Sequence, residues 1–332
     1  MFTSTDVSVI IPSFGSRGTI LHCLKSLYEQ EELPAEVIVA DSSEDDTVAL
    51  IHEHYPQVIT YKFEHRTFPG PARNKGTSLA RGSIVAFIDA DCLAAPDWVK
   101  RMAAQHSAGH QIVGGAVEVG NSKSLLAWAG HLGEFREFLP TGPERMVSHV
   151  PTCNISYRKA LIETYGGFPN AYYPQEDMLF NYLLARNGYR VWFDPAIRVR
   201  HFCRESLHGY LSHQHRVGRV TRVTLTRIEM EGSRLARRPW LAWAASPALG
   251  VVKYFRNLGI FWRSMPQEAI RRPALVPLLL LGSIWWARGF AAGALTGLSG
   301  LRGMIDPEED IFILFDQPPT RPTAIETPEF IP

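Results

Sequence analysis

The chain has 332 residues, a formal net charge of +1 and 20% charged residues. This length is enough for one large domain with appendages, or for two domains. The balanced charge gives no reason to expect nucleic acid or an acidic polymer as a partner. The cysteines lack the close spacing of a zinc site or a CxxC redox motif, so we expect reduced structural thiols at Cys23, Cys92, Cys153 and Cys203.

The N-terminal stretch "MFTSTDVSVIIPSF" has no basic segment followed by a long apolar core and a cleavage site. We therefore expect no secretory signal and a catalytic part that faces the cytoplasm.

From residue 7 the sequence alternates short apolar runs with amphipathic segments. Strands are expected over "VSVIIPSF", "AEVIVADSS", "QVITYKFE", "IVAFIDAD" and "IVGGAVEV", with helices at about 18–32, 44–55, 71–81 and 97–108. Strands that alternate with helices predict an α/β fold, in which helices flank a mostly parallel sheet with right-handed crossovers.

The pattern weakens over residues 120–150, which predicts an irregular connection on the acceptor side. Two helices should follow, "SYRKALIETYGGF" and "PQEDMLFNYLLARNGYRV", closed by Gly166 and Gly188. The segment "RVWFDPAIRVRHF" is expected to be extended, and a long polar helix should run from beyond 204 to near Pro239. One side of that helix would face a diphosphate, lipid headgroups or solvent with His208, His215, Arg219 and Arg222.

Two acids, Asp89 and Asp91, stand where the apolar run 84–88 ends. Ligands bind at the carboxyl ends of strands in open α/β sheets, so this pair indicates a divalent cation site. The alternative is an Asp-rich turn that only ends the strand.

Five segments occur in the order typical of one enzyme family: "VSVIIPSF", "VADSSEDDT", "GPARNKGTSLARG", "FIDAD" and "PQEDMLF". Over residues 6–220 the chain resembles the family 2 glycosyltransferases, which are inverting enzymes with the GT-A nucleotide-sugar fold. The resemblance implies metal-dependent transfer of a hexosyl group from a nucleotide-diphosphate donor, most often a UDP-sugar, to an acceptor hydroxyl.

The resemblance places Pro12 and Ser13 beside the nucleotide and makes Asp41 an acceptor of a hydrogen bond from the base, most often uracil. Where the family commonly has two adjacent acids, this chain has Ala40 and Asp41, so the base stays open. An ordinary Asx turn is the alternative for Asp41.

The segment "GPARN" predicts a helix whose N-terminus favours an anion, and Arg73 is a forked donor for phosphate. The resemblance places Arg73 and Asn74 next to the nucleotide. The alternative is a capped surface helix with solvated side chains.

A departing diphosphate requires charge neutralisation, which Mg²⁺ or Mn²⁺ supplies in an oxygen-rich site. The resemblance implies Asp91 as the direct metal ligand, Asp89 nearer the ribose or bound through water, and His201 as a contact of the metal or the diphosphate. It assigns Asp177 as the base that takes the acceptor proton, and Glu176, the acid that precedes it, as a second catalytic residue. Acids in a first helical turn also simply favour the helix dipole.

The composition divides the chain into a catalytic domain (1–235), an apolar helical region (236–302) and a Pro-rich acidic tail (303–332) that we expect to be disordered. The apolar region leaves three arrangements open: a span, a hairpin in one leaflet, or buried soluble helices. Its tryptophans and the flanking Arg263, Arg271 and Arg272 favour attachment to the inner membrane, with the catalytic domain in the cytoplasm.

An enzyme in that location would act on a lipid-linked or cell-surface glycan intermediate. A dinucleotide-dependent oxidoreductase is excluded because "PSFGSRGTI" lacks GxGxxG. A non-catalytic, nucleotide-sugar-binding membrane protein of the same fold is the remaining alternative.

Overall fold

The structure is a computed structural model that describes residues 1–170 and 172–296. The expected disorder of 303–332 lies outside these residues, as does the last part of the apolar region.

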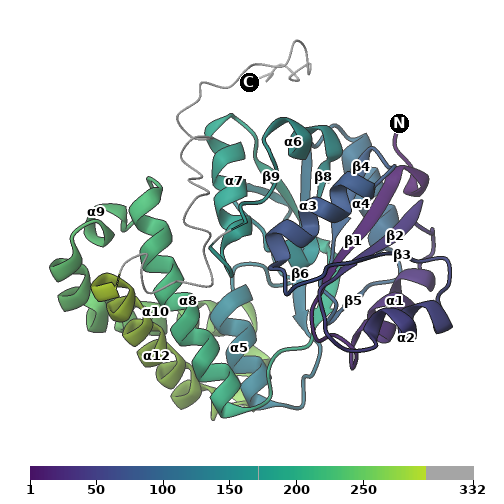
Figure 1. Cartoon of the computed structure of the whole chain (residues 1–332). Helices are drawn as coiled ribbons and strands as arrows, with labels where there is room; N and C mark the ends of the chain where they lie inside the picture. The colour runs from purple at the N-terminus through teal and green to yellow at the C-terminus, as the bar shows by residue number, and fades with distance from the viewer. Residues whose placement is uncertain (171, 297–332) are drawn as a thin grey trace.

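One nine-stranded sheet forms the centre of the molecule (Figure 1). Its main order is β3-β2-β1-β4-β8-β6-β9-β5, and β7 pairs with β9. The strands are β1 Val7–Ser13, β2 Glu36–Asp41, β3 Ile59–Lys62, β4 Ile84–Phe87, β5 Cys92–Ala94, β6 Ile112–Val119, β7 Arg145–Val147, β8 Ile155–Arg158 and β9 Val191–His201.

The sheet is mixed, which corrects the prediction of a mostly parallel one. Strands β1 to β4 pair in parallel, as the βα alternation requires, but β8 runs antiparallel to both β4 and β6. Strands β5 and β7 are antiparallel to β9. Three of the four residues of β8 lie within the segment predicted to be helical, so the sequence pattern does not indicate this reversal of direction.

Helices cover the sheet with their apolar sides, as predicted for α1 Ile20–Tyr28, α2 Thr47–His54, α3 Pro69–Leu79 and α4 Trp98–Ser107. Strands β1, β2 and β4 are buried along their whole length. This explains their continuous apolar sequences, since both faces of such strands are covered. Further along the chain lie α6 Lys159–Thr164 and α7 Glu176–Arg186.

The connection over 120–150 is not irregular, which corrects a second prediction. It contains α5 Leu125–Phe135, where Ser124 caps the helix by accepting a hydrogen bond from the backbone of Ala127. Eight of its residues are buried, His131 and the glycines included. A helix surrounded on nearly all sides shows no polar face, and so the periodicity that reveals surface helices is weak there.

The C-terminal helices form a layer beside the sheet, and α5 lies between this layer and the strands (Figure 1). They are α8 Leu207–Arg227, α9 Ser233–Ala236, α10 Pro239–Ser264, α11 Pro266–Arg271 and α12 Leu275–Thr296. The polar helix therefore ends at Arg227, earlier than the predicted end near Pro239.

Helices α8 and α12 pack with their backbones in close approach. A methyl group added to Gly218 would overlap the carbonyl oxygen of Trp286, and one added to Gly289 would overlap that of His215. The predicted His and Arg side of α8 thus lies partly against α12, with Arg222 buried, and does not form a fully solvated face.

We predict that Gly218→Ala destabilises the protein by about 1–3 kcal/mol, because α12 must move to admit the methyl group. Gly259→Ala is the matched control in α10, where the nearest atom to an added methyl is 3.4 Å away on the flexible Arg263 side chain. Alanine there should stabilise by about 0.5–1 kcal/mol. Chemical unfolding of both variants checks the pair, and equal stability of Gly218→Ala and wild type would contradict the packing described.

Candidate functional site

The predicted site residues meet at one edge of the sheet because strands β1, β2 and β4 are parallel. Ser13 and Asp41 are register partners at the ends of β1 and β2. Asp89 follows the end of β4, whose Phe87 pairs with Ile10 of β1. The carboxyl ends of these strands therefore bring donor-side residues from three separate segments together.

Asp41 is fully buried and organises the first two strand ends. Its carboxylate accepts hydrogen bonds from the Ser13 and Ser43 hydroxyls, both at 2.7 Å, and from the Ser43 backbone at 3.1 Å. The Lys62 ammonium adds an ion pair at 2.7 Å and also contacts the Ser43 carbonyl. A base that binds Asp41 must therefore displace one of these donors, and Lys62, with a side chain 41% exposed, is the most exposed of them.

Arg73 of α3 links the two acidic motifs. Its guanidinium donates to Asp89 Oδ1 at 2.9 Å and to Glu176 Oε1 at 2.8 Å, and the side chain is almost completely buried. Burial opposes the charge, but Asp89 and Glu176 outweigh it and raise the pKa of Arg73. The buried Arg73 guanidinium thus connects the end of β4 with the start of α7.

The side-chain amide of Asn74, next to Arg73, is hydrogen-bonded to the backbone of another segment. Its amide donates to the Phe168 carbonyl at 2.7 Å and accepts from the Phe168 backbone N–H at 2.8 Å. A side chain at Gly167, whose φ is +76°, would overlap the Asn74 oxygen. The Asn74 amide therefore fixes the loop before α7. The position of Asn74 beside the nucleotide stays a prediction.

Glu176 is a buried carboxyl with a raised pKa. Its carboxyl is 4% exposed, and Oε2 has no hydrogen-bond partner among the described residues. Burial and the charge of Asp177 raise the pKa of Glu176 and Arg73 lowers it, with a net value of about 7. Among the carboxyls whose charge acts on Arg73, Glu176 is thus a deeply buried one with a raised pKa.

Asp91 and His201 lie together although 110 positions separate them. Antiparallel pairing of β5 with β9 sets Cys92 opposite His201, and His201 Nε2 lies 3.5 Å from Asp91 Oδ1. Burial disfavours the charged imidazole, but Asp91 raises the pKa of His201. The other ring nitrogen, Nδ1, lies 3.3 Å from the Cys203 sulfur.

This geometry fits a divalent cation. In the described part of the chain, the ligand-type atoms of Asp91, Cys92 and His201 lie within 4.8 Å of one another. Burial raises the pKa of the Cys92 thiol well above its ordinary value, so the carboxylate and the imidazole are the effective donors. If Nδ1–H donates to Cys203, Nε2 is free to bind metal, and a mixed oxygen and nitrogen set suits Mn²⁺ better than Mg²⁺. Asp89, the third predicted metal residue, is turned toward Arg73.

Asp177 opens α7, where its carboxylate accepts hydrogen bonds from Thr152 at 3.2 Å and 3.3 Å. Its charge acts to raise the pKa of His149, although burial leaves that pKa lowered overall. Arg73 contacts both Glu176 and Asp89, so Asp177 and Asp91 each lie within two residues of a carboxyl that binds the same guanidinium.

Several residues near the site carried no signal in the sequence. The positive charge of Arg204, just past β9, acts on Asp91, and those of Arg204 and Arg216 act on Tyr173. The ring of Tyr173 stacks on Phe68 at 5.6 Å between centroids. Single basic residues such as Arg204 and Arg216 form no motif in the sequence. Their nearness to Asp91 and Tyr173 becomes visible only in the folded structure.

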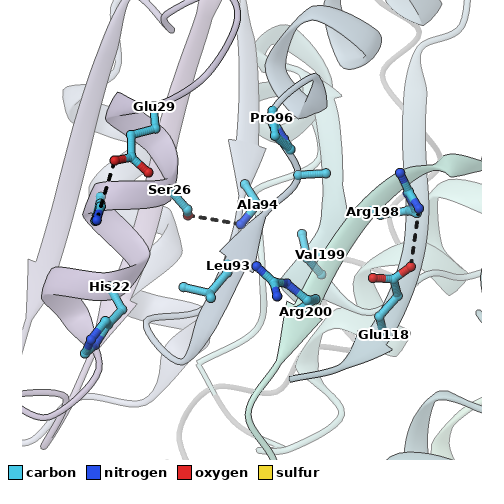
Figure 2. A pocket seen from close by; sticks show the side chains of 12 residues that line it. His22, Ser26, Glu29, Leu93, Ala94, Pro96, Glu118, Arg198, Val199 and Arg200 are labelled. Atoms are coloured by element: carbon cyan, nitrogen blue, oxygen red, sulfur yellow. Dashed lines mark hydrogen bonds and ion pairs between the residues drawn. The ribbon is translucent and has the colours of Figure 1, made fainter. Parts of the chain in front are cut away.

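A cavity of about 460 Å³ lies apart from these residues, between α1 and the β5–β9 pair (Figure 2). Most of its charges are paired: Lys25 lies 3.6 Å from Glu29 and Arg198 lies 3.6 Å from Glu118. Neither Asp91 nor Asp177 lines it.

Residues 8–166 match the family described as Glycosyl transferase family 2. These residues are a family 2 glycosyltransferase domain. The resemblance to this family is therefore confirmed over the first four of the five motifs. The match ends before PQEDMLF at the start of α7 and before the C-terminal helices.

Relatives of known name support this assignment. The succinoglycan biosynthesis protein ExoO of Rhizobium meliloti is 35% identical over 99 residues, which are 29% of this chain and 28% of that protein. The glycosyltransferase AglE of Haloferax volcanii is 27% identical over 236 residues, 67% of this chain and 77% of AglE. The first of these alignments thus spans little more than a quarter of the relative.

Solved structures confirm a GT-A fold. Residues 1–349 of S. aureus TarS in complex with UDP-GlcNAc have a TM-score of 0.51 at 19% identity, covering 89% of this chain and 92% of that one. The mannosyltransferase PcManGT of Pyrobaculum calidifontis, in complex with GDP-Man and Mn²⁺, has a TM-score of 0.53 at 20% identity, covering 86% and 88%. At these identities the likeness is one of fold.

The raised pKa of Glu176 generates a prediction about stability. Because the folded pKa is about 7 and the ordinary value is 4.5, the stabilisation is complete below about pH 4.5 and is lost as pH rises through 7. Glu176→Gln, which cannot ionise, should therefore gain stability relative to wild type between about pH 5 and pH 8.

Urea unfolding at a series of pH values measures this difference. Glu163→Gln is the control, because Glu163 is exposed on α6 and pairs with Lys159 at 3.4 Å. A gap between Glu176→Gln and wild type that stays constant with pH would show that Glu176 is already ionised in the folded protein.

Proposed function

We propose that this protein is a metal-dependent inverting glycosyltransferase that moves a sugar from a nucleotide-diphosphate donor to an acceptor hydroxyl. The observation that carries the proposal is the Arg73 bridge, which brings the aspartate pair after β4 and the acids of α7 to one site. An inverting transfer requires such an arrangement, because leaving-group stabilisation and base catalysis act on opposite sides of one sugar.

For the donor we propose a nucleoside diphosphate sugar, with UDP as the first candidate for the nucleotide. Support comes from structural neighbours that hold UDP-GlcNAc and GDP-Man. Pro12, Ser13 and Asp41 would form the base and ribose side, with Lys62 leaving Asp41 as the base arrives. Arg73, Asp89 and Asn74 would lie behind the diphosphate, where the buried guanidinium fixes the position of Asp89.

Asp91 and His201 are the proposed metal ligands, with Cys203 holding the imidazole by its far nitrogen. A bound divalent cation supplies neutralisation of the charge that develops on the diphosphate. Arg204, whose charge already reaches Asp91, would add a second, mobile cation near the leaving group.

Asp177 is the proposed general base. The Thr152 hydrogen bonds, at 3.2 Å and 3.3 Å, fix its orientation. In this position the carboxylate would accept the proton of the acceptor hydroxyl. Glu176, which precedes it, faces Arg73 and not the acceptor side. We therefore propose Glu176 as a positioning residue, where the sequence suggested a catalytic one.

The acceptor and the location are inferred together. We propose a lipid-linked or cell-surface glycan intermediate as acceptor, with the enzyme at the inner face of the cytoplasmic membrane. Of the described residues, α12 is the one helix long and apolar enough to cross a membrane. Curated relatives that act in glycan biosynthesis, such as ExoO, support this setting.

Asp177→Asn should lower the rate of transfer by about 10²–10⁴-fold, because general-base catalysis contributes that range. Donor affinity should be retained, since the residue lies on the acceptor side. Transfer assays with UDP- and GDP-sugars, together with calorimetric titration of UDP, separate the two effects. Donor binding without turnover by the wild type under all conditions would instead favour a non-catalytic sugar-nucleotide-binding protein.

Cys203→Ala should weaken Mn²⁺ binding by about 10–100-fold, the usual effect of losing the group that orients a metal-bound histidine. Cys203→Ser keeps an acceptor for the Nδ1 proton and should restore most of the affinity. Titration of Mn²⁺ by calorimetry in the presence of UDP gives the comparison. Identical affinities for alanine, serine and cysteine at this position would remove His201 from the metal site.

A further inference from the structure

Helix α10 exposes a continuous apolar surface that faces away from the rest of the protein. The exposed fractions are large for big apolar side chains, 77% for Trp240 and 63% for Phe255. At 100° per residue, six of the seven exposed large apolar residues of α10 fall on one side of the helix, and they are Trp240, Leu241, Val251, Val252, Phe255 and Trp262. The seventh, Trp243, lies at the edge of the buried side. The opposite side is buried, so this surface, which we call the α10 stripe, is not part of the core.

Helix α10 is about 39 Å long, since its 26 residues rise about 1.5 Å each, and the α10 stripe runs along most of it from Trp240 to Trp262. Monomeric soluble proteins rarely leave an apolar surface of that extent uncovered. Helix α12 adds exposed apolar residues on its free side, namely Leu280, Ile284 and Leu295.

Charge points to an anionic partner for this surface. From Ser233 to Gln267 the sequence contains basic residues but no aspartate or glutamate. Arg234, Arg237 and Arg238 are exposed just before α10, and Arg263 is exposed near its end. Tryptophans with an apolar ring and a polar N–H, set among arginines, suit the boundary between lipid headgroups and acyl chains.

Helix α12 cannot cross the bilayer in the folded arrangement. It is held against α8 through Gly282, Gly289 and Gly293, where added methyl groups would overlap or crowd Tyr210 and the α8 backbone. Insertion of α12 would therefore draw α8 into the hydrocarbon with its arginines and histidines, at prohibitive cost. Of the apolar window of α12, 39% is already buried within the protein.

We propose that the α10 stripe lies in the plane of an anionic membrane leaflet and that α12 supports it from behind without spanning. This inference rests on the proposed membrane location and specifies its geometry. The stripe is joined to the site through α5: Lys253 donates to the Gly133 carbonyl at 3.1 Å, and Arg256 lies 2.7 Å from Glu137. Phe135 of the same helix packs on His201 with ring centroids 5.0 Å apart. Docking would thus hold the metal ligands at a fixed height above the headgroups.

The test uses the full chain and vesicles of phosphatidylcholine with or without phosphatidylglycerol. Wild type should float with the anionic vesicles, less with neutral ones, and less again at high salt. The double variant Val251→Asp, Phe255→Asp should lose at least tenfold in partition, because both side chains are exposed and their charges would enter the acyl boundary. Leu33→Asp is the matched control, since Leu33 is exposed to the same 51% as Val251 but lies in the loop before β2, outside α10.

Three outcomes would overturn the inference. The double variant could bind vesicles as well as wild type, or the wild type could resist carbonate extraction from cell membranes as a spanning protein does. Alternatively, wild type could form a dimer in solution that the double variant dissociates, which would make the stripe a contact between two copies. Circular dichroism and UDP titration of every variant report folding and donor binding separately, so failure of the proposed activity would not be mistaken for failure of membrane docking.

Discussion

The buried guanidinium of Arg73 is the interaction on which the arrangement of the site depends. It contacts one carboxylate from the end of β4 and one from the start of α7, segments separated by about ninety residues of chain. A buried cation is stable only when it is paired, and removal of one partner from such a pair is strongly destabilising. The same contact that satisfies Arg73 therefore aligns the aspartate pair with the acids of α7.

The excess of acids around Arg73 gives the site its electrostatic character. Asp89, Glu176 and Asp177 act on one cation, and Asp91 adds a further carboxylate beside His201. Such a surplus favours cations, both the proposed metal and exposed side chains such as Lys62 and Arg204. Under the proposed function an incoming diphosphate would bind once these cations are in place, so donor binding would depend on metal binding.

The sequence indicated the parts of the fold where one local pattern decides the structure. Buried parallel strands such as β1 and β4 appear as unbroken apolar runs, and the acids that follow them mark the functional edge. It did not reveal α5, because a helix covered on nearly every side has no amphipathic period, nor the direction of β8, because four residues are too few to distinguish a strand from a helix start. The partner of Asp91 was foreseen through His201, whereas Cys203 and Arg204 become visible only once β5 and β9 pair.

The close packing of α8 against α12 also determines where the chain could be truncated or joined to another protein. Tyr210 and Val220 of α8 are buried, and Tyr210 donates to the Leu278 carbonyl at 3.1 Å. Helix α8 begins six residues after His201, the last residue of β9, so its packing against α12 is directly connected to that strand. The C-terminal helices therefore belong to the same packed structure as the catalytic half. A shortened chain that ends before α12 would expose the apolar side of α8 close to the strand that carries His201. Exchange of this region between related proteins would have to carry α8 along with it.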